Sequence, residues 1–212
     1  ILAKKVGEKN FKEFIKKTKI TQNPEIELEE VGVPHQLKWN RCKLETVSYG
    51  HGITTTPLQA TALYAAMSNG GKLIIPSLIK DRKTKPSQTI ISKETSNKLS
   101  NLLRKVVTSK VGTASLADKN GYYVGGKTGT AESYGDKKNR INTFISIFPA
   151  SKPKYTLFIM LENPKINKDL IYNYRGVETK APYNTSGWNS VYVAGKIIEK
   201  IGPILAINNK EF

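Results

Sequence analysis

The stretch covering residues 121–132 reads GYYVGGKTGTAE and places a cation and two hydroxyl groups side by side. Lys127 carries an ammonium group, and Thr128 and Thr130 carry hydroxyls on either side of the small residue Gly129. A lysine next to hydroxyl donors is suited to binding a carboxylate or a phosphate. The residue types therefore predict an anion-binding site, and the surrounding sequence must decide between the two kinds of anion.

A phosphate-binding loop is one interpretation of this stretch. Gly121, Gly126, Lys127 and Thr128 match the pattern G-x-x-x-x-G-K-[ST]. Such a loop needs a buried strand before it and a helix directly after it, because the N–H groups of the first helical turn bind the phosphate. The flanking segments are instead SLADKN, which is polar, and GTAESYGDKKNR, and the interior YYV favours a strand. We expect the match to be accidental, with a nucleotide-binding protein as the alternative from another class.

The clearest helix start in the chain lies in the segment TTTPLQATALYAAMSNGG. Thr56 is a suitable N-cap, Pro57 occupies the first helical position, and Gln59 would complete a capping box. Asn69 and the glycine pair after it provide a stop signal. This pattern predicts a helix that ends near residue 68.

The other elements follow from hydrophobic periodicity and turn residues. Helices are expected over residues 1–19, with a soft point at Gly7, after Ser92, and from about residue 187 to near the C-terminus. A short extended piece is expected at 26–28 and strands at 73–79, 122–131, 141–148 and 155–161. Adjacent strands with hairpin-length links, preceded and followed by helices, predict an α+β fold in which helices flank an antiparallel sheet.

Several motifs together resemble the transpeptidase domain of class B penicillin-binding proteins, and most of all the division-type peptidoglycan D,D-transpeptidases. The tripeptide K-T-G at 127–129 is one signature of penicillin-binding proteins and class A β-lactamases. It is accompanied by SYGHGITTTPLQ at 48–59, a G-G stop, VGTA at 111–114 and GKTGTA at 126–131. The resemblance covers nearly the whole chain. It implies the C-terminal part of the penicillin-binding/β-lactamase-like transpeptidase fold and serine acyl transfer without metal or cofactor.

The resemblance also implies roles for the residues of the K-T-G strand. The hydroxyls of Thr128 and Thr130 would bind the terminal carboxylate of a D-Ala-D-Ala peptide, and Lys127 would supply positive charge beside it. Gly129 would allow the extended substrate to approach the edge of the strand. The backbone N–H of Thr130 would form half of the oxyanion hole.

The family's nucleophile is a serine in S-x-x-K, and a third motif, S-x-N, completes the proton relay. The chain contains no S-x-N, and its two S-x-x-K matches begin at Ser77, in a predicted strand, and at Ser151, in a predicted turn. We therefore expect residues 1–212 to be the C-terminal portion of one transpeptidase domain whose nucleophile-bearing portion is absent. This fragment alone should form no acyl-enzyme.

The formal net charge is +17, from 34 basic and 17 acidic residues. Lysine dominates and is scattered, and arginine occurs only at Arg41, Arg82, Arg104, Arg140 and Arg175. Nucleic-acid readers concentrate basic residues on one face and rely on arginine forks, so the pattern favours a solvated surface. A basic nucleic-acid-binding module is therefore a minor alternative, and no nucleic-acid partner is expected.

The expected ligands are peptidoglycan stem peptides and β-lactam antibiotics. By the same resemblance, the intact protein would lie on the periplasmic side of the inner membrane, with a membrane anchor and partners in the division complex. A β-lactamase or a β-lactam sensor of the same fold is the alternative within this fold.

Overall fold

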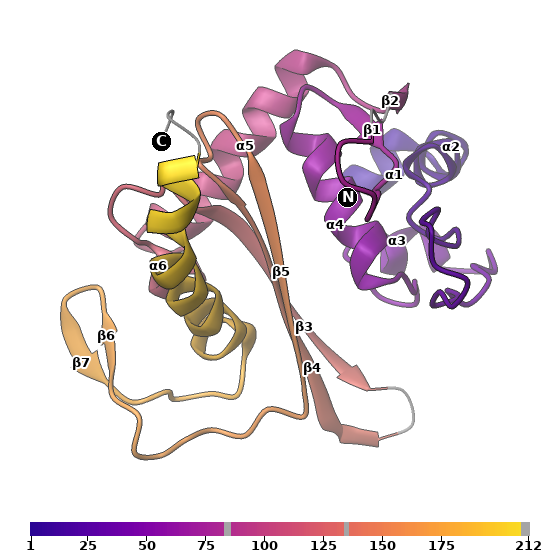
Figure 1. The fold of residues 1–212 in the computed structure, drawn as a ribbon. Helices are drawn as coiled ribbons and strands as arrows, with labels where there is room; N and C mark the ends of the chain where they lie inside the picture. The colour runs from indigo at the N-terminus through magenta and orange to yellow at the C-terminus, as the bar shows by residue number, and fades with distance from the viewer. Residues whose placement is uncertain (83–85, 134–135, 209–212) are drawn as a thin grey trace. The chain divides into compact units, whose positions relative to one another are not determined.

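The computed structural model describes residues 1–82, 86–133 and 136–208 (Figure 1). The chain forms two compact units, residues 1–93 and residues 94–212, and each has its own hydrophobic cluster. Over the described ranges, no helix combines the length and the apolar character needed to cross a bilayer. The assignment of the whole chain to one part of a single transpeptidase domain stays a prediction.

Most of the regular secondary structure in the described residues of the first unit is helical. The expected soft point at Gly7, with φ 83°, separates two helices in place of one long helix. Two short strands then pair antiparallel, and the small cluster of this unit contains Leu63, Ala66, Leu73 and Ile90. The elements are α1 (Leu2–Val6), α2 (Glu8–Thr18), α3 (Lys43–Val47), α4 (Pro57–Ser68), β1 (Lys72–Ile74) and β2 (Pro86–Thr89).

Helix α4 begins where its capping residues predict. The Thr56 hydroxyl accepts a hydrogen bond from the Gln59 backbone N–H at 3.1 Å, and Pro57 is the first helical residue. The Gln59 side chain does not complete the predicted capping box. Its amide donates instead to the carbonyls of Lys19 and Gln22, at 2.7 and 3.3 Å. This side chain therefore connects α4 to the turn that ends α2, where the Lys19 carbonyl also accepts from the Gln22 backbone N–H at 3.0 Å.

The second unit contains the main sheet. Its three strands have the order β3-β4-β5 and are antiparallel throughout. Strands β6 and β7 form a separate hairpin. The elements are α5 (Lys93–Thr108), η1 (Ser115–Ala117), β3 (Gly125–Ser133), β4 (Asp136–Phe148), β5 (Tyr155–Glu162), β6 (Tyr172–Tyr174), β7 (Val177–Thr179), η2 (Ser186–Trp188) and α6 (Ser190–Asn208).

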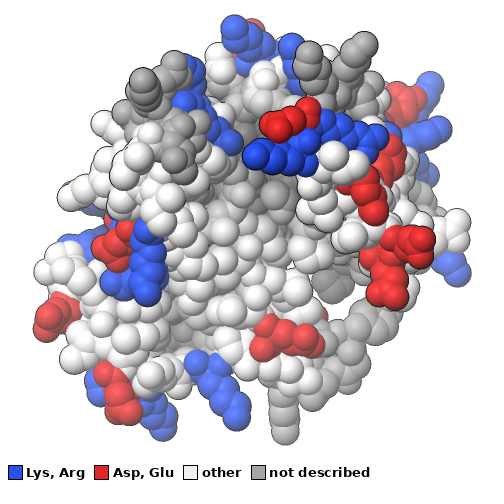
Figure 2. Space-filling view, in the orientation of Figure 1, with Lys and Arg blue, Asp and Glu red and all other residues white. Residues whose placement is uncertain are grey.

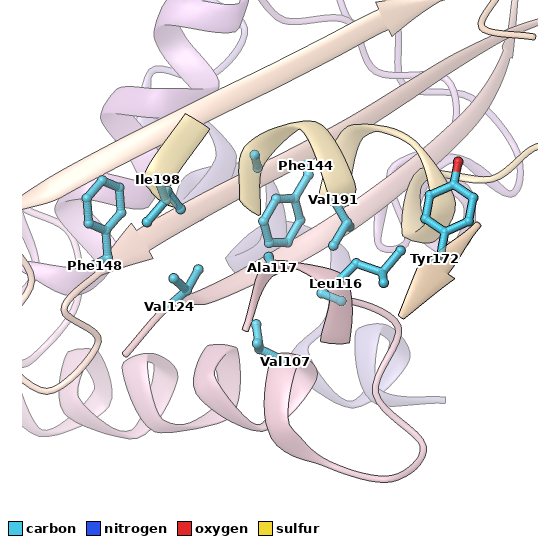
Figure 3. Close-up of a cluster of buried hydrophobic side chains, with 11 residues drawn as sticks. Val107, Leu116, Ala117, Val124, Phe144, Phe148, Tyr172, Val191 and Ile198 are labelled. Carbon is cyan, nitrogen blue, oxygen red and sulfur yellow. The ribbon is translucent and has the colours of Figure 1, made fainter. Parts of the chain in front are cut away.

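Helix α6 covers one face of this sheet (Figure 1). Phe144, at the centre of β4, is fully buried and lies in one cluster with Val191, Ala194 and Ile198 of α6 (Figure 3). Burying a side chain of this size contributes about 1.5–3 kcal/mol, so the contact is a principal support of the unit. The predicted α+β arrangement, an antiparallel sheet flanked by helices, is confirmed by this architecture.

Several predicted boundaries were wrong. The first strand of the sheet begins at Gly125 and not at residue 122, because Tyr123 adopts a φ of 47° that a strand cannot accommodate. The strand expected at 73–79 ends at Ile74, and no strand forms at 26–28. Helix α6 starts at Ser190, after the short turn η2. The short elements α3, β2, β6 and β7 were not predicted.

Candidate active site

The K-T-G motif lies on β3, at the edge of the three-stranded sheet. No described strand of this sheet pairs with the other side of β3. In an antiparallel edge strand, alternate residues direct both N–H and C=O away from the neighbouring strand. These groups can pair with an extended peptide that adds itself to the sheet. The position therefore fits the predicted role of the strand in binding an extended substrate.

The four predicted site residues divide between the two faces of the strand. Thr128 pairs with Phe144, so it lies on the face covered by α6, and Thr130 lies on the same face two residues later. Lys127 lies on the opposite face, where its Nζ donates to the Thr128 carbonyl at 2.8 Å. The ammonium group is thus placed against the backbone of the strand and away from the two hydroxyls.

Gly129 also lies on the Lys127 face, opposite Thr143 of β4. A Cβ added to Gly129 would lie 2.4 Å from the Thr143 hydroxyl oxygen. Gly126 is still more restricted, since its added Cβ would lie 2.5 Å from the Phe144 ring and 2.6 Å from the Ile145 carbonyl oxygen. Packing within the sheet therefore requires small residues in this motif, in addition to any contact with a substrate.

A pocket of about 360 Å³ lies beside the two threonine hydroxyls. One part of its wall is polar and another part is aromatic, where the rings of Tyr174 and Trp188 lie with their centroids 4.8 Å apart and their planes tilted by 30°. Such a pocket suits a ligand that combines an anionic group with an apolar one. Its lining includes Thr113, Thr128, Thr130, Tyr174, Ser186 and Trp188.

Two hydroxyl contacts in this pocket join segments that are distant in the sequence. The Oγ1 atoms of Thr113 and Thr128 lie 3.0 Å apart, and the Ser186 N–H donates to Thr130 Oγ1 at 3.2 Å. The Ser186 hydroxyl in turn bonds to the Thr143 carbonyl and to Ser190 Oγ. Each threonine hydroxyl of the K-T-G strand therefore has a fixed hydrogen-bonding neighbour.

Sequence reasoning missed both of those neighbours. The motif VGTA was recognised as a family feature, but no role was assigned to its Thr113. Ser186 lies in a turn-rich stretch that offered no periodicity, and only its burial, at 1% exposure, reveals its structural role. The sequence signal that could have pointed to Thr113 is its hydroxyl side chain inside the short glycine-containing motif VGTA.

The two S-x-x-K matches have unsuitable geometry for a nucleophile and its base. Ser77 lies outside any regular element, and its hydroxyl bonds to the Glu27 carboxylate at 2.6 Å. Ser151 lies in the turn that joins β4 to β5. An S-x-x-K pair needs a helix to bring its serine and lysine onto one face, and neither match lies on one. Neither match therefore has the helical arrangement that an S-x-x-K nucleophile and its base need.

The phosphate-loop alternative is also excluded by the backbone. Lys127 and Thr128 lie inside a strand that continues to Ser133, so no helix N-terminus follows them. The phosphate would lack the N–H groups on which such loops depend. Figure 2 shows basic and acidic side chains interspersed on the visible surface, an arrangement typical of a solvated exterior.

Comparison with known proteins gives concordant matches. Residues 1–183 match the penicillin binding protein transpeptidase domain. The chain is 29% identical over 227 residues to a probable peptidoglycan D,D-transpeptidase FtsI of Caulobacter vibrioides, covering 99% of this chain and 36% of that relative. It is 32% identical over 183 residues to the stage V sporulation protein D of Bacillus subtilis, covering 77% of this chain and 28% of that relative.

A solved structure shares the fold. The transpeptidase domain of penicillin-binding protein 3 from Burkholderia pseudomallei superimposes with a TM-score of 0.77 at 20% identity. The match covers 95% of this chain and 59% of that one. Against the two curated relatives, this chain spans 36% and 28% of the length. The arrangement of β3, β4, β5 and α6 is therefore one that a known transpeptidase domain also adopts.

Proposed function

This chain belongs to the penicillin-binding protein transpeptidase family, and we propose from this premise that it supplies the substrate-binding strand of a serine D,D-transpeptidase that cross-links peptidoglycan. The observation that carries the proposal is the edge strand β3, with Thr128 and Thr130 facing a pocket and hydrogen-bonded to fixed neighbours. An edge strand beside a polar pocket is suited to an extended peptide that ends in a carboxylate.

The proposed reaction proceeds in two acyl-transfer steps. A serine oxygen, from an S-x-x-K motif other than the two matches in this chain, bonds to the carbonyl carbon of the penultimate D-Ala. Its proton passes to a general base, the C–N bond breaks, and the nitrogen of the departing D-Ala takes up a proton. The amine of a second stem peptide then attacks the ester, which forms the cross-link and restores the serine hydroxyl.

The residues of β3 would bind and polarise the substrate in both steps. The hydroxyls of Thr128 and Thr130 would donate to the terminal carboxylate, and Lys127 would add positive charge from the other face of the strand. The N–H of Thr130 would stabilise the oxyanion as one donor of a pair, an interaction that is stronger in the transition state than in the ground state. Gly129 would let the peptide approach the strand closely.

The intact protein is proposed to act outside the cytoplasmic membrane, on the periplasmic side, with a membrane anchor and division-complex partners. β-Lactams are proposed as inhibitory ligands. Their ring amide can acylate the same serine while their carboxylate accepts hydrogen bonds from the hydroxyls of Thr128 and Thr130.

Labelling with a fluorescent penicillin tests the proposal on the full-length product of the gene. We expect a covalently labelled protein, and loss of label after preincubation with unlabelled penicillin. Thr128→Val, which keeps the shape but removes the hydroxyl, should lower the labelling rate by about tenfold, the order of one charge-assisted hydrogen bond. Absence of any labelling of the wild type would reject the function. Release of the label within seconds would instead identify a β-lactamase.

A further inference from the structure

The turn of the β6–β7 hairpin contains an unusual residue for its backbone conformation. Arg175 and Gly176 both have positive φ, 58° and 83°, and they join two strands through a two-residue loop. Turns of this kind favour Asn-Gly, Asp-Gly or Gly-Gly, because a positive φ is unfavourable for a long side chain. An arginine at the first position therefore needs a compensating interaction.

The Arg175 guanidinium makes that interaction with the loop that follows α5. Its Nη2 donates to the carbonyl oxygens of Ser109 and Gly112, each at 2.8 Å, and the group lies 5.0 Å from the centroid of the Tyr174 ring. The loop is also packed against α5, since a Cβ on Gly112 would lie 2.2 Å from the Val106 carbonyl oxygen. Arg175 therefore binds two carbonyls of a loop that is also packed against α5.

The same loop presents Thr113 to the K-T-G strand. Thr113 directly follows Gly112, and its hydroxyl lies 3.0 Å from the Thr128 hydroxyl. Its carbonyl oxygen is closely packed by η2, where a Cβ on Gly187 would lie 2.7 Å from it. Thr113 is therefore held from two sides while its side chain contacts the hydroxyl that is proposed to bind the substrate.

We propose that Thr113 and Arg175 are positioning residues for Thr128. A hydroxyl has one proton to donate and two lone pairs to accept with. When Thr113 donates to Thr128, the Thr128 proton is free to point toward the substrate carboxylate. Arg175 keeps loop 109–113 at the distance that this requires. The inference rests on the proposed function, because it specifies how the carboxylate-binding hydroxyl is oriented.

Three variants of the full-length protein test the role of Thr113 and Arg175. Thr113→Val removes the hydroxyl, Thr113→Ser keeps it, and Arg175→Asn removes the tether while placing Asn-Gly in the turn, the favoured pair. The measured quantity is the second-order rate constant of acylation by a penicillin with a free carboxylate and by the same penicillin with that group converted to a neutral amide.

The expected acylation rates distinguish a positioning role from a general loss of structure. Thr113→Val should slow acylation by the carboxylate probe about tenfold, with little effect on the amide probe, and Thr113→Ser should restore the rate to within about twofold. Arg175→Asn should slow the carboxylate probe by about three- to tenfold and speed hydrogen exchange of the amides in loop 109–113. Arg175→Lys, which keeps the charge but places its donor nitrogen one bond nearer the backbone than Nη2, should behave like Arg175→Asn.

Each contrary result has a defined meaning. If the wild type is not acylated by either probe, the proposed function fails. If the wild type reacts and Thr113→Val changes the rate by less than twofold, or slows both probes equally, the positioning inference is overturned. Unchanged hydrogen exchange in loop 109–113 of both Arg175 variants would overturn the proposal that Arg175 holds this loop in place.

Discussion

Replacing Ser186 with alanine tests how η2 is held against the sheet beside the pocket. Ser186 is 1% exposed, and its hydroxyl donates to the Thr143 carbonyl of β4. The same hydroxyl lies 2.8 Å from Ser190 Oγ at the start of α6. Alanine would remove both bonds at this buried position, which costs about 1–3 kcal/mol, although Ser190 Oγ would keep its bond to the Ser186 carbonyl at 3.3 Å.

Ser186→Ala should therefore lower the Tm by roughly 2–12 °C, since about 1 kcal/mol corresponds to about 2–4 °C for a domain of this size. It should also slow penicillin acylation, because the Ser186 N–H that fixes Thr130 Oγ1 would be less well placed. The measurements are scanning fluorimetry and the acylation rate, both on the full-length protein.

The matched control for this change is Ser151→Ala, in the exposed turn between β4 and β5. A surface substitution of this kind changes stability by less than about 0.5 kcal/mol. Because Ser151 also begins an accidental S-x-x-K match, its removal should leave acylation unchanged. Equal Tm values for Ser186→Ala and Ser151→Ala would refute the argument that the buried hydroxyl holds η2.

Two further changes test the packing of β3 and the charge of a surface carboxylate. Gly126→Ala places a Cβ 2.5 Å from the Phe144 ring and should cost about 1–3 kcal/mol by overpacking, visible as a lower Tm; an unchanged Tm would contradict the close packing. The Ser77 hydroxyl and the Leu78 N–H lower the pKa of Glu27 from 4.5 to about 2. Because this folded-state pKa is depressed, the stabilisation is present above about pH 4.5 and is lost as the pH falls toward 2. Glu27→Gln should therefore flatten the dependence of Tm on pH in that window, and an identical profile for both proteins would contradict it.

Local signals in the sequence predicted the elements that depend on neighbouring residues. The start of α4 followed from Thr56 and Pro57, and the break at Gly7 followed from a glycine inside a helical pattern. Strands β4 and β5 of the main sheet followed from runs of apolar residues between turns. Caps, turns and periodicity act over a few positions, so a single chain segment contains the information.

Elements that are too short to show a period were not predictable in this way. Helix α3 has five residues, and β6 and β7 have three each. A helix or hairpin of this length is marginal by itself and forms because the rest of the unit packs against it. The ring of Tyr172 on β6, for example, contacts those of Trp188 and Tyr192.

For the candidate site, the sequence by itself determined the motif, the family resemblance and the placing of a cation and two hydroxyls on one strand. Only the tertiary structure decided which residues contact these groups. Thr113 reaches Thr128 from 15 positions away, Ser186 reaches Thr130 from 56, and Arg175 reaches the Gly112 carbonyl from 63. Such contacts depend on closing long stretches of chain around a common core, because no local preference of a hydroxyl or a guanidinium specifies a partner that far along the sequence.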